Sequence, residues 1–374
     1  MNIPELSAFV NIKHCLPATG TWHKSVHIFD ERTAQAIRAA LASGRPLLVR
    51  GEPGTGKSQL ARAASIVLGR RFLSYVVDAH TEIQDLWYRF DAVSRLGNAQ
   101  VLSVTGKNMT ELQMDEKLSP EKYLSPGILW WAFAWSDANK KKGHHPFFIP
   151  DENDPGEEEK GVVLLLDEID KADADLPNSL LETLDNGRFT VPWIKKTVGV
   201  AHGELSKRPL VILTTNEDRQ LPGAFVRRCL VLDLRLPKER NALMRYLKER
   251  AIFHFPAEIE QDADCGQRIQ RDESGTPLHK SRFHDDVLSE AAEQLYKDRQ
   301  EANSLGVTPP GQAEYLDMLR VLDQLVPGDT GQQKVLLKTI KEFALRKYPG
   351  MQKEEPDARV DSKEVTLKED EAAE

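Results

Sequence analysis

The segment GEPGTGKS at residues 51–58 constrains the fold more than any other feature of this 374-residue chain. It satisfies the pattern G-x-x-x-x-G-K-[ST], and it lies between an apolar run at residues 46–49 and an amphipathic segment that stops at Gly69. A buried strand, a glycine-rich turn and a helix in this order form a loop whose backbone N–H groups converge on phosphate. We therefore expect Lys57 to contact the β- and γ-phosphates of a nucleotide, and the Ser58 hydroxyl to ligate Mg²⁺.

Short apolar runs recur along the first two thirds of the chain and alternate with segments of helical periodicity. Continuous apolar runs are typical of strands that are buried on both faces, and their alternation with helices indicates a doubly wound parallel sheet. The expected fold class is thus α/β, a Rossmann-like parallel sheet flanked by helices. Further strands are expected at residues 72–77, 162–166, 210–213 and 229–234.

The apolar run at residues 162–166 leads directly into Asp167 and Glu168. Carboxylates at the carboxyl end of a buried strand face the crevice where open α/β sheets bind ligands, so both side chains are expected near the phosphates. We expect Asp167 to hold the Mg²⁺ shell and Glu168 to polarise the attacking water. Asp170 is assigned no chemistry, because it could instead cap the next helix.

The run at residues 210–213 also ends in polar side chains, the last of which is Asn216. An asparagine there can hydrogen-bond the attacking water or the γ-phosphate, although a simple turn is the alternative. Arg227 and Arg228 stand just before the next apolar run. Surface solubility is the usual reason for such a pair, but the position also suits an arginine finger that reaches the ATP of a neighbouring subunit.

The rest of the chain divides by composition and periodicity. Residues 1–29 are turn-prone and are expected to be a linker, residues 30–236 the core, and residues 237–350 a small all-α lid. Within the core, an insert is expected at about residues 80–125, and the charged stretch at 137–160 is expected to be an exposed loop. Residues 351–374 are rich in Glu, Asp and Lys and are expected to be a disordered tail.

The formal net charge of −8 disfavours nonspecific binding to nucleic acid, which usually needs a basic face, although a local basic patch could sit on an acidic protein. The three cysteines, Cys15, Cys229 and Cys265, lie far apart without CxxC spacing. This pattern predicts free thiols in a reducing compartment. No apolar run approaches the roughly 20 residues of a membrane helix and no signal peptide is visible, so a cytoplasmic location is expected.

These pieces, in this order, resemble the AAA+ ATPases, and more closely the MoxR family within the clade that carries an insert in helix 2. The resemblance spans roughly residues 30–325 and implies ATP and Mg²⁺ as ligands. Its segments are GEPGTGKS, LWYRFD at 86–91, SPGIL at 125–129, LLLDEIDKAD at 164–173, LLETLDNGRFTVP at 180–192, TTN at 214–216 and RRC at 227–229. The expected nucleotide-binding residues are Gly51, Glu52, Pro53, Gly54, Thr55, Gly56, Lys57, Ser58, Gln59 and Asp167, with Ser58 and Asp167 as metal ligands.

The resemblance also implies a ring, usually a hexamer, with active sites between subunits. Asp167 and Glu168 match the Walker B position of the family, and Asn216 matches sensor 1. Arg228 matches the arginine finger because it directly precedes a cysteine that opens a strand, and Arg227 is the substitute. One departure is that residues 308–313 (TPPGQA), the place of the sensor 2 arginine in many AAA+ lids, contain no arginine.

Three functions are compatible with these features. The first is ATP-driven remodelling or activation of a protein partner, because MoxR-like proteins commonly work with a client and a von Willebrand factor A-type partner. The second is a nucleic-acid motor or sensor, which the net charge and the absence of a basic helix disfavour. The third is a regulatory switch that binds ATP but barely hydrolyses it, which Glu168, Asn216 and Arg228 disfavour. No membrane contact is expected.

Overall fold

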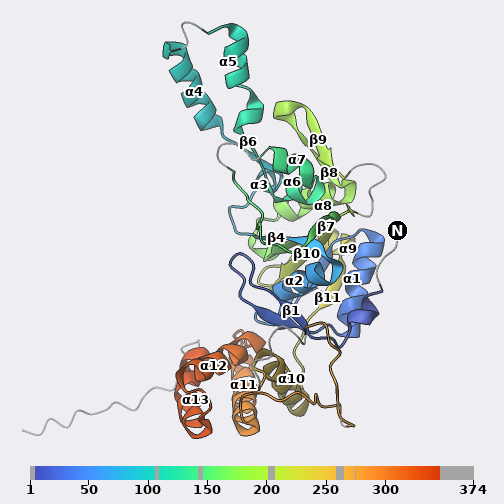
Figure 1. Ribbon diagram of the computed structural model, residues 1–374, viewed down its shortest axis with the longest axis vertical. Coiled ribbons are helices and arrows are strands. Elements are labelled where there is room, and N and C mark those ends of the chain that lie inside the picture. Colours follow the sequence, from blue (N-terminus) through green and yellow to red (C-terminus); the bar gives the residue numbers. More distant parts are fainter. Residues whose placement is uncertain are drawn as a thin grey trace, which may run out of the picture.

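The protein is described by a computed structural model that covers residues 5–105, 109–141, 146–200, 207–257, 265–273 and 275–345. A parallel sheet with helices on both faces forms the middle of the molecule, and the helices of the C-terminal region gather at one end (Figure 1). The predicted α/β class with a helical C-terminal region is therefore confirmed. The tail predicted for residues 351–374 lies outside the described residues.

The sheet consists of five parallel strands: β3 (Leu47–Arg50), β4 (Arg70–Val76), β7 (Glu157–Asp167), β10 (Leu210–Thr215) and β11 (Leu230–Asp233). Their order is β11-β3-β10-β7-β4, so β10 lies between β3 and β7. Ile212 of β10 pairs with Leu47 on one side and with Leu165 on the other. Because the carboxyl ends of parallel strands meet at one edge of a sheet, the loops that follow β3, β10 and β7 are neighbours.

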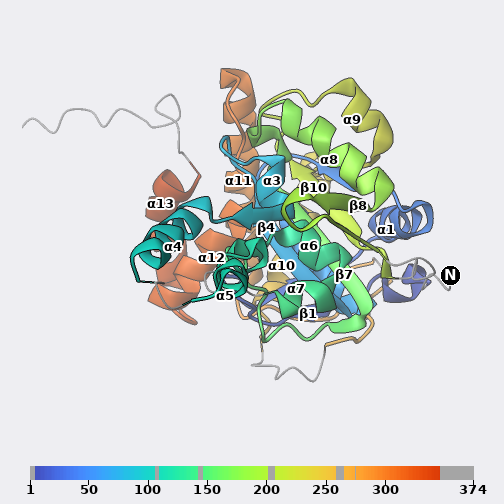
Figure 2. The ribbon, with the colours of Figure 1, turned by 90° about the horizontal axis from the view of Figure 1, so that it is seen from above.

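Helices cover both faces of this sheet (Figure 2). Successive residues of a strand point to opposite faces. Accordingly, Leu164 packs with the cluster that contains Leu180, whereas Leu165 packs with the cluster that contains Leu60. Burial on both faces is the reason why the β7 segment is continuously apolar. The flanking helices are α1 (Glu31–Ser43), α2 (Lys57–Leu68), α6 (Ile128–Phe133), α8 (Asp175–Asn186) and α9 (Gly223–Arg228).

A helical projection extends from the core where the sequence predicts an insert (Figure 1). An antiparallel pair, β5 with β6, closes its base. The longest helix of the projection, α4, has no buried residue, and Val93, Leu96 and Val104 on it are exposed. The elements are α3 (Ile83–Trp87), β5 (Tyr88–Phe90), α4 (Ala92–Thr105), α5 (Glu111–Lys117), η2 (Pro120–Tyr123) and β6 (Leu124–Pro126).

The prediction of an exposed loop at residues 137–160 is wrong at both ends of this range. Its first residues belong to α7 (Trp135–Lys140), and its last residues belong to β7, which begins at Glu157. This first stretch of β7 is charged and mostly exposed, so no apolar run marks it as a strand. Residues 142–145 of the predicted loop lie outside the described residues. Beyond α8, a small hairpin is formed by β8 (Arg188–Val191) and β9 (Lys196–Gly199).

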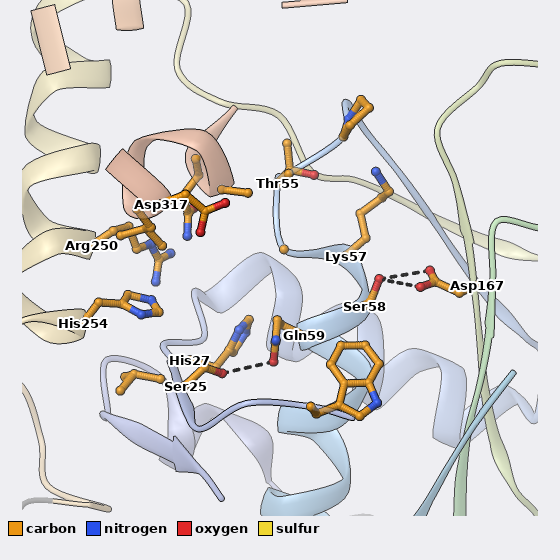
Figure 3. A pocket seen from close by; sticks show the side chains of 18 of the residues that line it. Ser25, His27, Thr55, Lys57, Ser58, Gln59, Asp167, Arg250, His254 and Asp317 are labelled. Carbon is orange, nitrogen blue, oxygen red and sulfur yellow. Dashed lines mark hydrogen bonds between the residues drawn. The ribbon is translucent and has the colours of Figure 1, made fainter. Parts of the chain in front are cut away.

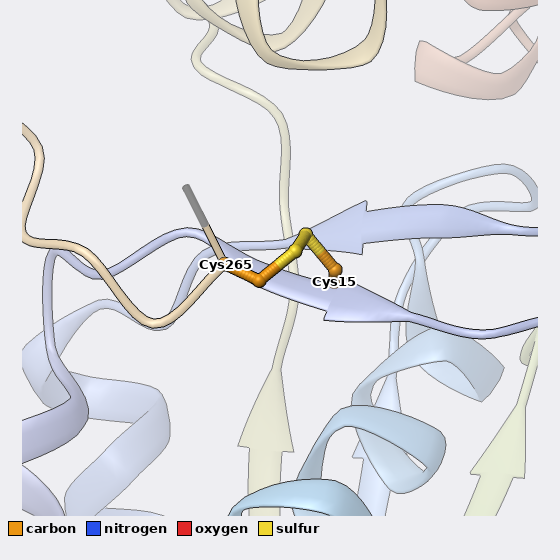
Figure 4. Close-up of a disulfide and its surroundings, with 2 residues drawn as sticks. All are labelled: Cys15 and Cys265. Atoms are coloured by element: carbon orange, nitrogen blue, oxygen red, sulfur yellow. A yellow bond between two sulfur atoms is a disulfide. The ribbon is translucent and has the colours of Figure 1, made fainter. Parts of the chain in front are cut away.

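The N-terminal segment, predicted to be a linker, contains η1 (Leu6–Phe9) and a hairpin of β1 (His14–Leu16) and β2 (Ser25–His27). Residues 265–269 run along this hairpin, where Lys13 N donates to the Gln267 carbonyl and Ile269 N donates to the Asn11 carbonyl. A disulfide joins Cys15 to Cys265 (Figure 4). The prediction of three free thiols is therefore wrong for these two residues, whereas Cys229 is a buried free cysteine.

Loss of the disulfide is expected to destabilise the fold. Cys15 and Cys265 are 250 residues apart, so the bond closes a long loop in the unfolded chain. Cys15→Ser should lower the free energy of unfolding by about 2–5 kcal/mol under non-reducing conditions. Urea unfolding of this variant, compared with wild type in the presence and absence of a reductant, measures the effect. Equal stability of wild type with and without the reductant would contradict the prediction.

The C-terminal region is a helical unit with its own apolar core, to which Leu247, Leu295 and Leu319 each contribute from a different helix. Among the described residues, no helix is both long and apolar enough to cross a membrane. The helices are α10 (Arg240–His254), α11 (Asp285–Leu305), α12 (Gln312–Leu325) and α13 (Thr330–Ala344).

Candidate nucleotide-binding site

The turn between β3 and α2 places the ammonium group of Lys57 at the centre of the loop at residues 51–58. Gly56 precedes α2 with φ +90°, a conformation that favours glycine and turns the chain into the helix. The Lys57 Nζ donates to the carbonyls of Gly51 at 2.7 Å and Glu52 at 2.9 Å. Burial lowers the pKa of Lys57, and the carboxylate of Asp167 partly opposes this shift. A phosphate group at the loop would supply the negative charge that this buried ammonium needs.

Ser58 and Asp167 meet across the edge of the sheet (Figure 3). The Ser58 hydroxyl lies 3.0 and 2.9 Å from the two carboxylate oxygens of Asp167. Thr214, near the end of β10, donates a hydrogen bond from its hydroxyl to the same carboxylate. Three neighbouring strand ends thus bring together two side chains that the sequence predicts as metal ligands.

Glu168 is held in a backbone conformation that L-residues rarely adopt, with φ +59°. Such a conformation costs about 1–3 kcal/mol and persists where the surroundings enforce it. Its N–H donates to the Thr214 hydroxyl at 2.9 Å, and its carboxylate accepts from the Asn216 amide at 3.1 Å. The predicted neighbours Glu168 and Asn216 therefore contact each other directly.

Asp170 does not cap the following helix, because the N-cap of α8 is Ala174. It lies in η3 (Ile169–Lys171), is buried, and accepts from the Asp218 N–H at 3.0 Å. The contact fastens the loop after β7 to the loop after β10. Because these loops carry Glu168 and Asn216, Asp170 helps to fix the distance between them.

A cavity of about 400 Å³ connects these groups to the N-terminal hairpin and to the C-terminal helices (Figure 3). Gly51 and Glu52 do not line it, and neither do Arg227 and Arg228. The remaining predicted site residues all line the cavity, namely Pro53, Gly54, Thr55, Gly56, Lys57, Ser58, Gln59, Asp167, Glu168 and Asn216.

The far end of the cavity was not predicted from the sequence. Ser25 of β2 donates to the Gln59 side chain at 3.2 Å, and His27 of the same strand faces Arg250 and His254 of α10. Burial, and to a smaller extent the nearby charge of Arg250, lowers the pKa of His27 to about 3 and that of His254 to about 4. Both imidazoles are therefore neutral at pH 7 and can pack against an uncharged nucleobase. The available signal was the four-residue spacing of Arg250 and His254, which places them on one face of a helix.

A comparison with models of protein families agrees with these features of the sheet and its loops. Residues 46–229 match the model of the AAA domain of the dynein-related subfamily. These residues form an AAA domain. AAA domains belong to the nucleotide-binding P-loop proteins, and proteins that contain them typically assemble into rings.

The chain is also distantly similar to solved structures. A presumed ATPase from Cytophaga hutchinsonii is 12% identical with a TM-score of 0.31, over 84% of this chain and 79% of the other. PCH-2 of C. elegans is 18% identical with a TM-score of 0.34, over 83% of this chain and 66% of the other. Neither likeness is close enough to bear on the site. No curated protein matches the chain.

The AAA domain has a donor set that suits Mg²⁺ bound together with a nucleotide. The described residues contain no cluster of three or more His, Cys, Asp or Glu side chains that could hold a metal alone. Magnesium in nucleotide sites is usually held by one or two protein oxygens together with phosphate oxygens and water. The Ser58 hydroxyl and the Asp167 carboxylate, within 3.0 Å of each other, fit this pattern.

Arg227 and Arg228 lie at the amino ends of the strands, whereas the phosphate loop lies at their carboxyl ends. They end α9, just before β11, and Leu230 of β11 pairs with Leu47 at the start of β3. Both side chains are exposed, and Arg228 lies 3.4 Å from the carboxylate of Asp185. Arg45 supports this helix end by donating to the carbonyls of Arg228 at 2.9 Å and Cys229 at 3.1 Å.

Proposed function

We propose that this chain is an ATP hydrolase that works in a ring of identical copies and remodels or activates a protein partner, as MoxR-like chaperones do. The observation that carries the proposal is the convergence of Ser58, Asp167, Glu168 and Asn216 beside Lys57 at one edge of the sheet. Such a site has groups for holding phosphates and separate groups for activating water. A protein that binds nucleotide without hydrolysing it needs only the groups that hold the phosphates.

Phosphate binding falls to the loop at residues 51–58. Its N–H groups and the amino end of α2 present partial positive charge, and Lys57 adds a full charge. Ser58 and Asp167 would hold Mg²⁺, which supplies further positive charge against the phosphate oxygens. The lowered pKa of Lys57 would rise again when phosphate charge is bound next to it.

Water activation falls to Glu168. Its carboxylate lines the same cavity as Lys57 and Ser58 and would accept a hydrogen bond from the attacking water and polarise it. The amide of Asn216 donates to one oxygen of this carboxylate at 3.1 Å and thereby orients it. This pairing supports hydrolysis over a regulatory switch, because a switch has no use for an oriented base.

The position of Arg228 supports a site that two copies share. Arg228 lies beside the start of β3, and the phosphate loop follows the end of β3. The four residues of this strand place the two about 13 Å apart along the strand direction. An arginine at that end of the sheet lies well away from the phosphate loop of its own chain. In a ring, the same end can face the site of the next copy, where its guanidinium would stabilise charge on the transferring phosphate.

Mixing two inactive variants tests the shared site. Arg228→Ala should bind ATP but hydrolyse it about 10³–10⁵-fold more slowly, as expected for loss of an arginine finger. Lys57→Ala should bind ATP about 100-fold or more weakly than wild type and should therefore hydrolyse almost none by itself. A mixture should regain hydrolysis, because an intact phosphate loop of one variant can face an intact Arg228 of the other. Phosphate release is measured after light scattering has shown that the variants exchange subunits.

Exchange of subunits without recovered hydrolysis would reject the shared site. Normal turnover by Arg228→Ala alone would instead assign the role to Arg227, the adjacent exposed arginine. Asp185→Asn is the control, since it removes the carboxylate next to Arg228 but leaves the guanidinium in place. It should hydrolyse ATP at close to the wild-type rate.

The partner is proposed to be a protein client or a von Willebrand factor A-type protein, and not nucleic acid or a membrane. The projection formed by α4 and α5 offers exposed apolar side chains at Val93, Leu96, Val101 and Leu112. Exposed apolar patches of this kind are typical of protein contacts. The net charge of −8 also favours a protein over nucleic acid.

A further inference from the structure

A buried arginine of the C-terminal helices contacts the phosphate loop. Arg299 of α11 is only 8% exposed, and its guanidinium is divided between two partners. One nitrogen donates to the Glu52 carboxylate at 2.7 Å, and another donates to the Pro310 carbonyl at 2.6 Å. Glu52 belongs to the phosphate loop, and Pro310 belongs to the segment that leads into α12. One side chain therefore joins the loop to the start of a C-terminal helix.

The segment before α12 also touches the phosphate loop through its backbone. The Ala313 N–H donates to the Gly54 carbonyl at 3.1 Å. A Cβ atom at Gly311 would lie 2.7 Å from the Pro53 carbonyl oxygen, so only glycine permits this approach. This is the stretch that lacks the arginine found in many AAA+ lids. Here residues 308–313 meet the loop without a positively charged side chain of their own, and Arg299 contributes a positive charge beside them.

Glu52 contacts both Arg299 and Lys57, the side chain that would bind phosphate. The Glu52 carboxylate is held by Arg299, while the Glu52 carbonyl accepts from the Lys57 ammonium at 2.9 Å. The same carbonyl accepts from the Thr55 hydroxyl at 2.9 Å. The position of Glu52 thus contributes to the fold of the loop and, together with the Gly51 carbonyl, to the position of the Lys57 ammonium.

We propose that Arg299 is a positioning residue for nucleotide binding, which acts through Glu52 to hold the phosphate loop and Lys57 in place and to fasten α12 to them. The inference rests on the proposed nucleotide binding at this loop. It also gives the C-terminal helices a way to respond to phosphate, because a shift of the loop moves Glu52 and with it the Arg299–Pro310 contact. Arg299 itself touches no reacting atom.

A set of matched variants separates this role from simple fastening of helices. Arg299→Met keeps the length and packing of the side chain but removes the charge, and Glu52→Gln removes the charge of its partner. Arg240→Met is the control, because Arg240 and Glu293 form an ion pair of the same 2.7 Å length between α10 and α11, within the C-terminal helices. Arg299→Lys retains the charge with fewer donors.

The readouts are ATP affinity by calorimetry and, without nucleotide, hydrogen exchange of the amides at residues 51–58. Arg299→Met should weaken ATP binding about tenfold, equivalent to ~1.4 kcal/mol, and should speed exchange in the loop. Arg299→Lys should recover part of the affinity, and Arg240→Met should change neither readout. In a Glu52→Gln background, Arg299→Met should have less than a third of its original effect, because the two residues act through one contact.

An equal loss of affinity in Arg240→Met, or an undiminished effect of Arg299→Met in the Glu52→Gln background, would overturn the inference. If Arg299→Met does not fold, Arg299→Lys and Glu52→Gln decide it by the same two readouts. If the wild-type protein binds no ATP, the proposed function fails. In that case hydrogen exchange alone decides the inference, and unchanged exchange in Arg299→Met would overturn it.

Discussion

Lys57→Ala is expected to weaken ATP binding by about 100-fold or more, the largest effect on affinity of any single substitution in this chain. The Lys57 ammonium is buried and touches only the Gly51 and Glu52 carbonyls, so no other side chain supplies a full positive charge at the centre of the described loop. Without it, the phosphates would rely on backbone N–H groups and the helix dipole. Calorimetric titration with ATP measures the loss directly.

Lys160→Ala is the matched control for this substitution. Lys160 is an exposed lysine on β7, paired with Glu157 at 2.8 Å, and it lies near the end of the sheet away from the phosphate loop. Its removal should leave ATP affinity unchanged. Unchanged affinity in Lys57→Ala would mean that the phosphates do not bind at residues 51–58.

Glu168→Gln is expected to keep ATP binding close to that of wild type while turnover falls by about 10²–10⁴-fold, the range for loss of a general base. Glutamine has the shape of glutamate, so the loop after β7 should keep its conformation. Its neutral amide cannot polarise water as a carboxylate does. Paired measurements of ATP affinity and steady-state phosphate release separate the two effects.

Glu217→Gln is the control that tests whether loss of any acidic residue near the site lowers turnover. Glu217 follows Asn216, shares the left-handed conformation of Glu168, and faces Arg50 at 3.8 Å. Its substitution should leave turnover within about threefold of wild type, since exposed ion pairs contribute little. Turnover near wild type in Glu168→Gln would show that another group activates the water.

The fold of the AAA domain could be predicted because its elements carry local patterns. Asp30 caps α1 by accepting from the Thr33 N–H at 2.7 Å, and Gly44 and Gly69 end α1 and α2 in the left-handed conformation. Continuous apolar runs mark the strands of a parallel sheet that is buried on both faces. Once these strands are parallel neighbours, the side chains at their carboxyl ends have to meet, so Asp167, Glu168 and Asn216 could be grouped in advance.

The far end of the cavity could not be predicted because it depends on segments that approach from distant parts of the chain. His27 and Ser25 lie on β2, a short strand of only partly buried residues, without an apolar run to mark it in the sequence. The pairing of Cys15 with Cys265 requires residues 265–269 to fold back onto this hairpin, which no local spacing encodes. Likewise, nothing around Arg299 in the sequence indicates that Glu52 is its partner.

Phosphate release by wild-type protein is the most direct measurement of the proposed activity. The initial rate with ATP is followed with and without Mg²⁺, over protein concentrations that span assembly as seen by light scattering. We expect Mg²⁺-dependent release whose rate per chain rises as rings form and which is lost in Glu168→Gln. A folded protein that releases no phosphate at any concentration would contradict the proposal. So would a rate per chain that is independent of both Mg²⁺ and assembly.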